Sequence, residues 1–482
     1  MKKIISVLFL FCFIIPLCGC EKESVSRAKY QISIELNEDM TVDCKSVYNY
    51  ILNGDASSIY FNLYPNAFSE NATVSPVYKS DELSAYPSGK SYGKVDVFNV
   101  KVDDKDASFE VLGTNDGTLK VGFDSNKAKG DSVEVYIEFK VTLPNVNHRF
   151  GYGDNTVNLT GFYPVSCVYE NGKYYECVYY PAGDPFYSEC ADYEVELKVP
   201  SEYVVASSMN ALSTEWSGGY TTYNYQRQNV RDVAFILSKK FSVLQKTQNG
   251  VDVKYYYFAD KEPEKTLDTA CASLDFFSEK YFKYPYKEYV VAEGDFLYGG
   301  MEYPCLSLIS SSVGDSYRDY VVAHETAHQW FYGIVGVNQN EIGFFDEGLT
   351  ELSTALFMSD YTNTLYENYI KEATASYLSI RQSLVYAGNT LPPIMERHLK
   401  DFSSEGEYVM IAYNRSELAF EEVRKILGED KFYKLIKKLF KEYAYQNVTL
   451  NDFENLLEKQ SKSAVKTFNS YVSGEAFVKI AD

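Results

Sequence analysis

The chain has 482 residues, 45% of them apolar, and its 46 Lys and Arg stand against 67 Asp and Glu for a net charge of −21. This length predicts two or three domains, and the ordinary apolar fraction excludes wholesale disorder. Because a surface this acidic repels phosphate, we expect no nucleic-acid partner. Nine Cys are too few for a disulfide-built scaffold, and four His leave few places for a site with several imidazoles.

The first 19 residues have the pattern of an export signal. A basic start precedes an apolar run of about a dozen residues, which is too short to span a bilayer. The run ends in Leu17-Cys18-Gly19-Cys20, which resembles a bacterial lipobox, a signal that is cut before a cysteine that then carries lipid. We therefore expect a signal peptide over 1–19, lipid on Cys20 and a tether over 20–29. The alternative is an ordinary signal peptide with incidental cysteines.

These features predict that the mature chain lies on the outer side of the cell membrane, held there by lipid. No second apolar stretch of spanning length follows residue 20, so we expect the remainder to be soluble and extracytoplasmic. Six cysteines remain in it, and we expect mostly free thiols. Cys167 and Cys177 flank a two-residue hairpin turn at Asn171-Gly172, and in that register Cys177 points to the other face of the ribbon.

The hydrophobic pattern changes character about halfway along the chain. From about residue 30 to 240, apolar residues alternate with polar ones between Gly, Asn and Asp turn signals, which predicts β-strands. After residue 241 a last β segment gives way to helical periodicity at 264–281, 317–334, 346–360, 405–427, 429–443 and 449–461. We predict an α+β chain with an amino-terminal β domain over 30–240 and a mainly helical domain over 241–482.

The helical half carries two histidines at metal-ligand spacing. His324 and His328 lie four residues apart in an amphipathic stretch without Pro or Gly, so on a helix both imidazoles can reach one ion. Glu325 lies one step around the helix, where it can face a water without binding the metal. The bland alternative is a coincidental helix pair.

A third ligand is available 19 positions after His328, at Glu347. Two His and one Glu leave a fourth position open, which is typical of catalytic rather than structural zinc. Glu351 lies four residues further on the same helical face, where it can accept the remaining ring N–H of a ligand histidine. A solvated carboxylate is the equal alternative for Glu351. His148 and His398 have no ligand-spaced partners, and we expect them at the surface.

This combination resembles the gluzincin metallopeptidases of the aminopeptidase N and leukotriene A hydrolase type. The stretch Tyr298-Gly299-Gly300-Met301-Glu302-Tyr303-Pro304 is similar to the exopeptidase motif of that family, and Tyr413-Asn414-Arg415-Ser416 to its tyrosine motif. Residues 63–68 and 183–189 look like segments of its amino-terminal domain. The resemblance implies an all-β, saddle-like amino-terminal domain followed by a thermolysin-like catalytic domain.

The resemblance also implies a role for each matching residue. His324, His328 and Glu347 would hold one Zn²⁺ per chain, with Glu325 as the general base and Tyr413 as the donor to the developing oxyanion. Within the exopeptidase motif, Glu302 would pair with the α-ammonium of the substrate, alongside Gly299, Gly300 and Met301 as substrate-binding residues. The implied function is a monomeric aminopeptidase acting on peptides with a free amino terminus.

Two departures from the family pattern bear on these roles. Tyr303-Pro304 replaces the usual Asn after Glu302, and Arg415-Ser416 replaces Lys-Gly after the tyrosine. Tyr408 is a nearby rival for Tyr413. Two other functions therefore stay open: a thermolysin-like endopeptidase with the same zinc ligands, and a non-catalytic surface binding protein on the same fold.

Overall fold

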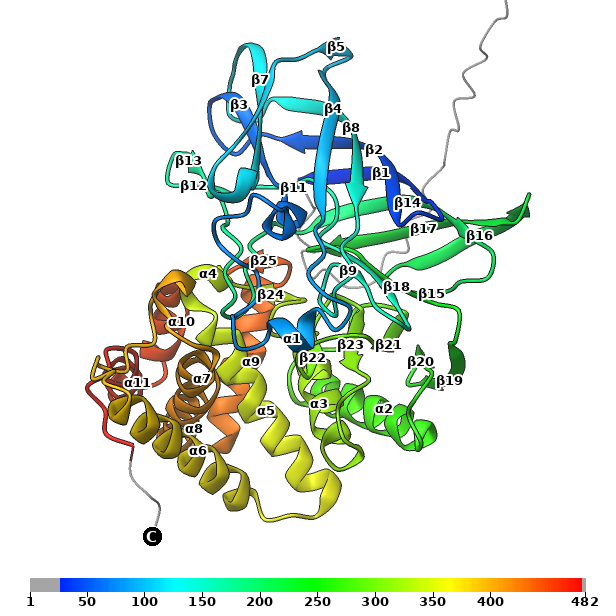
Figure 1. Cartoon of the computed structure of the whole chain (residues 1–482). Coiled ribbons are helices and arrows are strands. Elements are labelled where there is room, and N and C mark those ends of the chain that lie inside the picture. Colours follow the sequence, from blue (N-terminus) through cyan, green and yellow to red (C-terminus); the bar gives the residue numbers. More distant parts are fainter. Residues whose placement is uncertain (1–26, 479–482) are drawn as a thin grey trace, which may run out of the picture.

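The computed structural model describes residues 27–478, so the predicted signal peptide and Cys20 lie outside the described residues. Strands dominate the first half of this range and helices most of the second (Figure 1). This order confirms the predicted fold class, an all-β amino-terminal part followed by a mainly helical part. None of the helices in residues 27–478 is long and apolar enough to cross a bilayer.

An eight-stranded sheet forms the largest layer of the β part. Its strands run in the order β16-β17-β14-β1-β2-β8-β4-β5. Strands β1 and β14 are parallel, and the other neighbouring strands of this sheet are antiparallel. They are β1 (Ala28–Leu36), β2 (Thr41–Ile51), β4 (Lys94–Val102), β5 (Lys105–Asp106), β8 (Ser132–Thr142), β14 (Ala191–Pro200), β16 (Asn210–Ser217) and β17 (Tyr220–Val230).

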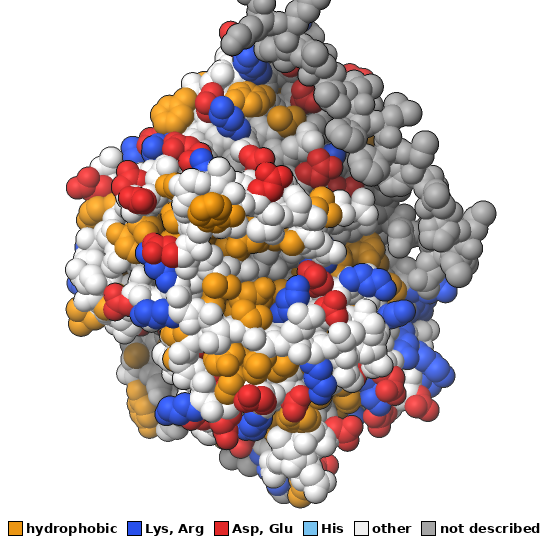
Figure 2. All heavy atoms as spheres, turned by 90° about the vertical axis from the view of Figure 1, so that its right-hand side faces the viewer, with side chains coloured by type: hydrophobic (Ala, Val, Ile, Leu, Met, Phe, Trp, Pro, Cys, Tyr) orange, Lys and Arg blue, Asp and Glu red, His pale blue; other side chains and the backbone are white. Residues whose placement is uncertain are grey.

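Alternation along each strand sorts this sheet into a buried and a solvated face. In β1, Tyr30, Ile32 and Ile34 are buried, whereas the residues between them face outward. Lys29 pairs across strands with Glu194 at 2.7 Å, as opposite charges on neighbouring strands favour. Acidic and basic side chains are interspersed with apolar ones over the face of the molecule in Figure 2.

Three smaller β units complete this part. One four-stranded sheet holds β15 (Val204–Ser207), β18 (Ala234–Ser238), β10 (Val157–Thr160) and β9 (Gly151–Tyr152); another holds β11 (Val165–Ser166), β3 (Ala56–Asn62), β7 (Thr118–Lys127) and β6 (Phe109–Leu112). The predicted hairpin is present as β12 (Tyr169–Glu170) and β13 (Lys173–Tyr174), with Glu170 opposite Lys173. All six cysteines of the described residues are buried, and Cys44, Cys167, Cys177, Cys271 and Cys305 are free thiols, as expected.

A mixed five-stranded sheet connects the β part to the helices. Its order is β19-β20-β21-β23-β22, so the exopeptidase-like motif lies on an edge strand. The strands are β19 (Ser242–Gln248), β20 (Val251–Tyr257), β21 (Glu288–Gly294), β22 (Gly300–Met301) and β23 (Leu306–Ser310). A two-stranded pair, β24 (Val335–Gly336) with β25 (Gln446–Asn447), joins segments more than 100 residues apart.

The helices lie mainly in the lower part of Figure 1, next to this sheet, with α1 (Glu82–Ala85) nearer its centre. They are α1 (Glu82–Ala85), α2 (Pro263–Lys280), α3 (Asp315–Ala327), α4 (Gln339–Ile342), α5 (Phe344–Thr362), α6 (Tyr366–Tyr386), α7 (Glu405–Tyr408), α8 (Ser416–Leu427), α9 (Glu429–Tyr443), α10 (Leu450–Glu458) and α11 (Lys462–Val472). Short 3₁₀ turns cover Tyr64–Phe68, Thr114–Asp116 and Leu399–Asp401, and a π-helical segment covers Val409–Arg415.

Three details differ from the predicted helices. Helices α1, α4, α6 and α11 were not predicted. Helices α1 and α4 have four residues each, and α6 buries only four of its residues, so its apolar stripe is too thin to show in the sequence. The stretch predicted over 317–334 stops being helical at Ala327. The stretch predicted over 405–427 is interrupted by the π-helical segment, which hydrophobic periodicity does not register.

The expectation that His148 lies at the surface is wrong. Its side chain is fully buried, with aromatic edge contacts to Phe68, Tyr179 and Phe296. Burial lowers the pKa of His148 well below its usual value, so the ring is neutral and packs as an aromatic group. His398 is half-buried, with its ring against Tyr180.

Candidate metal centre

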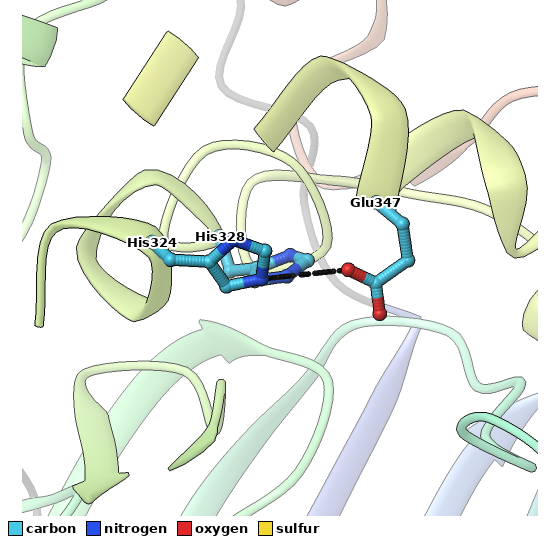
Figure 3. A group of neighbouring side chains, drawn as sticks. All are labelled: His324, His328 and Glu347. Carbon is cyan, nitrogen blue, oxygen red and sulfur yellow. Dashed lines mark hydrogen bonds and ion pairs between the residues drawn. The ribbon is translucent and has the colours of Figure 1, made fainter. Parts of the chain in front are cut away.

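Three side chains converge at the end of α3 and the start of α5. The Nε2 atoms of His324 and His328 are 3.1 Å apart. Oε2 of Glu347 lies 3.5 Å from the first of these nitrogens and 3.3 Å from the second. Figure 3 shows the two rings side by side, with the glutamate carboxylate pointing toward them from the neighbouring helix. The sequence spacing therefore corresponds to one cluster in space, whose ligand atoms all lie within 4.8 Å of one another.

The cluster fits a zinc ion. Zinc bonds of about 2.0–2.1 Å in tetrahedral geometry place ligand atoms about 3.3 Å apart, and the three separations are 3.1, 3.3 and 3.5 Å. Oε2 of Glu347 is buried and has no hydrogen-bond partner among the described residues, as expected of an atom reserved for a cation. All three side chains are buried, so a cation there would be largely desolvated.

An oxygen atom lies close to the outward-facing nitrogen of each ring. Nδ1 of His328 lies 3.0 Å from the carbonyl oxygen of Phe331, and Nδ1 of His324 lies 3.0 Å from Oε1 of Glu351. A ring nitrogen that donates a hydrogen outward leaves Nε2 with a free lone pair for a metal. Glu351 therefore lies where a partner of His324 is needed. Its other carboxylate oxygen accepts from the hydroxyl of Tyr320 at 2.5 Å.

Glu325 faces the same space without joining the cluster. Its side chain is buried, and its Oε2 has no hydrogen-bond partner among the described residues. Burial raises the pKa of Glu325 to about 8, against the opposing effect of the nearby histidines. Gly300 lets the edge strand approach this carboxylate, because a Cβ at that position would come within 2.5 Å of Glu325 Oε1. The position suits a proton acceptor beside the cluster.

The site holds more carboxylates than it can keep charged without a cation. Burial raises the pKa of Asp346 well above its usual range, and that of Asp184 to about 7. Burial disfavours the charged form of His328, but Glu302 and Glu347 outweigh it and raise the pKa of the ring to about 10. A divalent ion would relieve this crowding of negative charge.

The cluster opens into a cavity of about 190 Å³ between the β part and the helices. Glu302 of the exopeptidase-like motif lines it, as do Gly299 and Gly300, whereas Met301 is buried behind the strand, where its sulfur accepts from Arg149 Nε at 3.0 Å. The β part contributes Asp184, in a buried ion pair with Arg149. The predicted substrate-binding stretch and the cluster therefore share one cavity.

Tyr413 also reaches the cluster, from the π-helical segment. Its hydroxyl donates to Oε1 of Glu347 at 2.7 Å, and its ring stacks 5.9 Å from that of His324. Tyr408 lines the cavity as well, with its ring centre 6.0 Å from that of Tyr413. A π-helix turns wider than an α-helix, and such segments are frequent at functional sites.

Gln339 is a contact that the sequence did not reveal. Its amide nitrogen donates to Glu302 Oε1 at 3.1 Å and to Asp346 Oδ2 at 3.0 Å, joining two buried carboxylates. Of its neighbours, Asn338 caps α4 by accepting from the amide of Asn340, and the Asn340 side chain donates to the carbonyl oxygen of Pro185. The buried Arg149–Asp184 pair was also missed, because its members lie 35 residues apart in irregular segments.

The sequence around this site is similar to that of known peptidases. Residues 265–471 match the sequence model of the Peptidase family M1 domain. Aminopeptidase M1-B of Oryza sativa subsp. japonica is 27% identical over 305 residues, which cover 57% of this chain and 33% of that protein. Endoplasmic reticulum aminopeptidase 2 of Homo sapiens is 26% identical over 283 residues, covering 54% and 29%. The chain thus spans about a third of the length of these relatives.

Solved structures extend the likeness in fold to nearly the whole chain. The M1 zinc metallopeptidase of Deinococcus radiodurans superposes with a TM-score of 0.69 at 15% identity, covering 95% of this chain and 96% of that one. A mutant of that protein bound to the substrate Tyr-Ser-Ala gives a TM-score of 0.66 over the same shares. These matches confirm the two-part architecture, and together with the family match they support the expected class, a metallopeptidase with one zinc ion.

Proposed function

We propose that this chain is a zinc aminopeptidase that removes amino-terminal residues from peptides. The observation that carries the proposal is the position of Glu302, whose buried carboxylate lines the same cavity as the metal cluster and Glu325. A carboxylate at a fixed distance from the reacting centre pairs with an α-ammonium and so selects the end of a peptide. The similarity to plant and human aminopeptidases supports this substrate class.

Each residue then has a defined task. A bound zinc ion, held by His324, His328 and Glu347, supplies Lewis-acid activation of the scissile carbonyl and of water. Glu325 takes a proton from the attacking water and delivers it to the departing amine, from its buried position beside the cluster. Tyr413 turns its hydroxyl from Glu347 toward the oxygen on which negative charge develops.

The cavity supports a short ligand rather than a long one. Its volume of about 190 Å³ lies below the about 300–1,000 Å³ of typical small-molecule sites. Its lining contains several carboxylates, including Glu302 and Glu405, and these suit a cationic group such as an α-ammonium.

Paired substrates test the proposal. The mature domain should hydrolyse aminoacyl-arylamides with a free amine and leave their N-acetylated counterparts nearly intact. The variant Glu302→Gln should raise KM for the free-amine substrate by about 10–100-fold, the loss expected for a charge-assisted contact worth about 1.5–3 kcal/mol. Equal cleavage of free and blocked substrates would refute the exopeptidase assignment and favour a thermolysin-like endopeptidase.

Measurements of activity and zinc content distinguish a non-catalytic binding protein from the aminopeptidase and from the endopeptidase. Activity that is absent in the parent although one zinc ion is bound per chain would favour that alternative, and activity lost on chelation and regained with zinc would exclude it.

We propose further that the protein acts as a monomer outside the cytoplasm, anchored by lipid on Cys20. The support is the sequence Leu17-Cys18-Gly19-Cys20 after an apolar run of signal-peptide length. The first described strand begins at Ala28, so a tether of only a few residues would hold the domain near the membrane surface.

A further inference from the structure

The segment that follows His328 contains an unusual backbone conformation. Tyr332 has a φ of +106°, whereas the eleven other non-glycine residues with positive φ in residues 27–478 lie between 48° and 66°. Glycine adopts such a value readily, but for a bulky residue it is an outlier that the surrounding structure must impose.

Two consecutive residues of the β part clamp Tyr332 from both ends. Arg231 donates from Nε to the Tyr332 carbonyl oxygen at 2.6 Å, and Asp232 accepts from the Tyr332 hydroxyl at 2.6 Å. All three side chains are buried. The clamp therefore fixes the main chain of Tyr332 through its carbonyl and the side chain through its hydroxyl.

Arg231 is itself held rigidly. Its guanidinium also donates to the carbonyl oxygens of Ser188 and Gln446, at 2.9 and 2.6 Å. It packs against β24 at Gly336, where a Cβ would come within 2.1 Å of the guanidinium carbon. A planar group with this many fixed acceptors has little freedom to let the Tyr332 carbonyl move.

The clamped residue directly follows the carbonyl that orients a metal ligand. Phe331 O lies 3.0 Å from Nδ1 of His328, and the amide of Gly333 donates to His328 O at 3.0 Å. The φ and ψ angles of Tyr332 thus set how the turn closes back on His328. A second contact to the same ring nitrogen, Thr350 Oγ1 at 3.2 Å, comes from α5.

We propose that Arg231 and Asp232 act as positioning residues for the metal centre: by holding Tyr332 in its left-handed conformation, they keep the Phe331 carbonyl where it fixes the His328 imidazole. The inference rests on the proposed zinc site. A partner that orients a ligand histidine changes metal affinity by about 10–100-fold when it is lost, so the clamp should be visible in zinc affinity.

The test compares zinc affinity with the stability of the metal-free protein. Zinc dissociation constants are measured by competition with a chromogenic chelator, and melting temperatures after exhaustive chelation. Tyr332→Phe should weaken zinc binding by about 10-fold or more. Tyr255→Phe is the matched control, because that buried tyrosine also donates to an aspartate, Asp260, at 2.9 Å but lies on β20. The control should lower the melting temperature and leave the zinc affinity unchanged.

A second pair isolates the backbone conformation. Tyr332→Gly and Tyr332→Ala both lose the hydroxyl contact with Asp232 and keep the carbonyl that accepts from Arg231. Gly adopts positive φ without strain, whereas Ala keeps the strain. We expect zinc affinity in the order parent, Gly variant, Ala variant. Asp232→Asn keeps an acceptor for the hydroxyl and should bind zinc within about threefold of the parent.

The outcomes separate this inference from the proposed function. A parent that binds no zinc would contradict the metal centre itself. A parent that binds zinc no more tightly than Tyr332→Phe and Tyr332→Ala would overturn the clamp and leave the metal centre in place. Variants that fail to fold are replaced by Asp232→Ala, which removes the acceptor and leaves Tyr332 in place.

Discussion

The hydroxyl of Tyr413 donates to Oε1 of Glu347 at 2.7 Å, on the oxygen opposite the one that faces the two histidines. Tyr413 is thus hydrogen-bonded to Glu347, the cluster residue on α5, rather than to the two histidines at the end of α3. The same hydroxyl that is proposed to stabilise the transition state holds a ligand in place beforehand, so its two effects have to be measured separately.

Tyr413→Phe should lower kcat by about 10²–10³-fold, the loss seen when one preorganised donor to an oxyanion is removed. Zinc stoichiometry should stay at one per chain, because Oε2 of Glu347 faces the histidines regardless of this bond. Tyr408→Phe is the matched control from the same cavity wall and should lower kcat by less than tenfold. A larger loss in Tyr408→Phe would reverse the assignment.

Gln339→Ala should impair recognition of the amino terminus more than the chemical step. The amide holds Glu302 at 3.1 Å and Asp346 at 3.0 Å, and without it the Glu302 carboxylate loses the donor that fixes its orientation. We expect KM for free-amine substrates to rise about 10-fold, as for the loss of about 1.4 kcal/mol, with a smaller change in kcat.

The control for this prediction comes from the same loop. Asn338→Ala removes only the cap of α4, in which the Asn338 side chain accepts from the amide of Asn340, and should leave KM within about twofold of the parent. Steady-state kinetics on both variants would decide the matter, and equal shifts in KM would show that the loop as a whole, not the amide of Gln339, sets recognition.

Glu325→Gln and Glu347→Gln should separate catalysis from metal binding. Glu325 is not among the three residues of the cluster, so its variant should keep one zinc per chain while activity falls by at least about 10²-fold. Glu347→Gln loses a charged ligand and should lose zinc together with activity. Metal analysis after dialysis, paired with rates, checks both, and retained activity in Glu325→Gln would exclude it as the general base.

The stability of the apo-protein should depend on Asp232. Burial raises the pKa of this carboxyl to about 6, against the hydrogen bond from Tyr332. Because the folded pKa lies above the unfolded value of 3.8, the folded state holds the proton more tightly, and stability falls as the pH rises from about 4 to about 6. The shift of about 2.2 units corresponds to about 3 kcal/mol at most.

Replacing the carboxyl removes this dependence. The difference in unfolding free energy between Asp232→Asn and the parent should change by up to about 3 kcal/mol in favour of the variant between pH 4 and pH 7. Urea unfolding of chelated samples measures it, and any constant cost of the unpaired amide cancels in the comparison. A difference that stays flat with pH would mean that Asp232 titrates normally.

Lipid attachment at Cys20 is checked with a neighbouring cysteine as control. Cys20→Ser should abolish labelling by a fatty-acid analogue and leave the precursor uncut, because the thiol that carries the lipid is gone. Cys18→Ser, two residues earlier, should still be labelled and cut. Labelling of the Cys20→Ser protein would show that Leu17-Cys18-Gly19-Cys20 is not a lipobox.

Local spacing accounts for what the sequence could predict. His324 and His328 lie four residues apart on a helix, and Glu347 lies near the start of the next long helix. The cluster therefore follows from helical periodicity and from the 19 positions between His328 and Glu347. Glu351 is likewise one helical turn from Glu347. The two-part fold follows from the change of hydrophobic period near residue 240. The hairpin at Asn171-Gly172 follows from its turn residues.

The remaining contacts depend on segments brought together only by folding. Gln339 reaches Glu302 from 37 residues away, and Tyr332 meets Asp232 across 100 residues. No local pattern marks such pairs. The burial of His148 was missed for a related reason, since the aromatic rings around it come from three distant stretches. The π-helical segment that presents Tyr413 leaves an ordinary helical signature in the sequence.

The contacts of Arg231 also set an order of events during synthesis. Its guanidinium bridges the backbone at Ser188, Tyr332 and Gln446, so the bridge is incomplete until the last of these has emerged. Strand β24, which leads away from the histidines, likewise waits for β25 as its partner. Both ligand histidines are made more than 100 residues before that point. The nascent chain therefore carries its metal-binding residues for some time before the scaffold that orients them is complete, and tight zinc capture becomes a late step in folding.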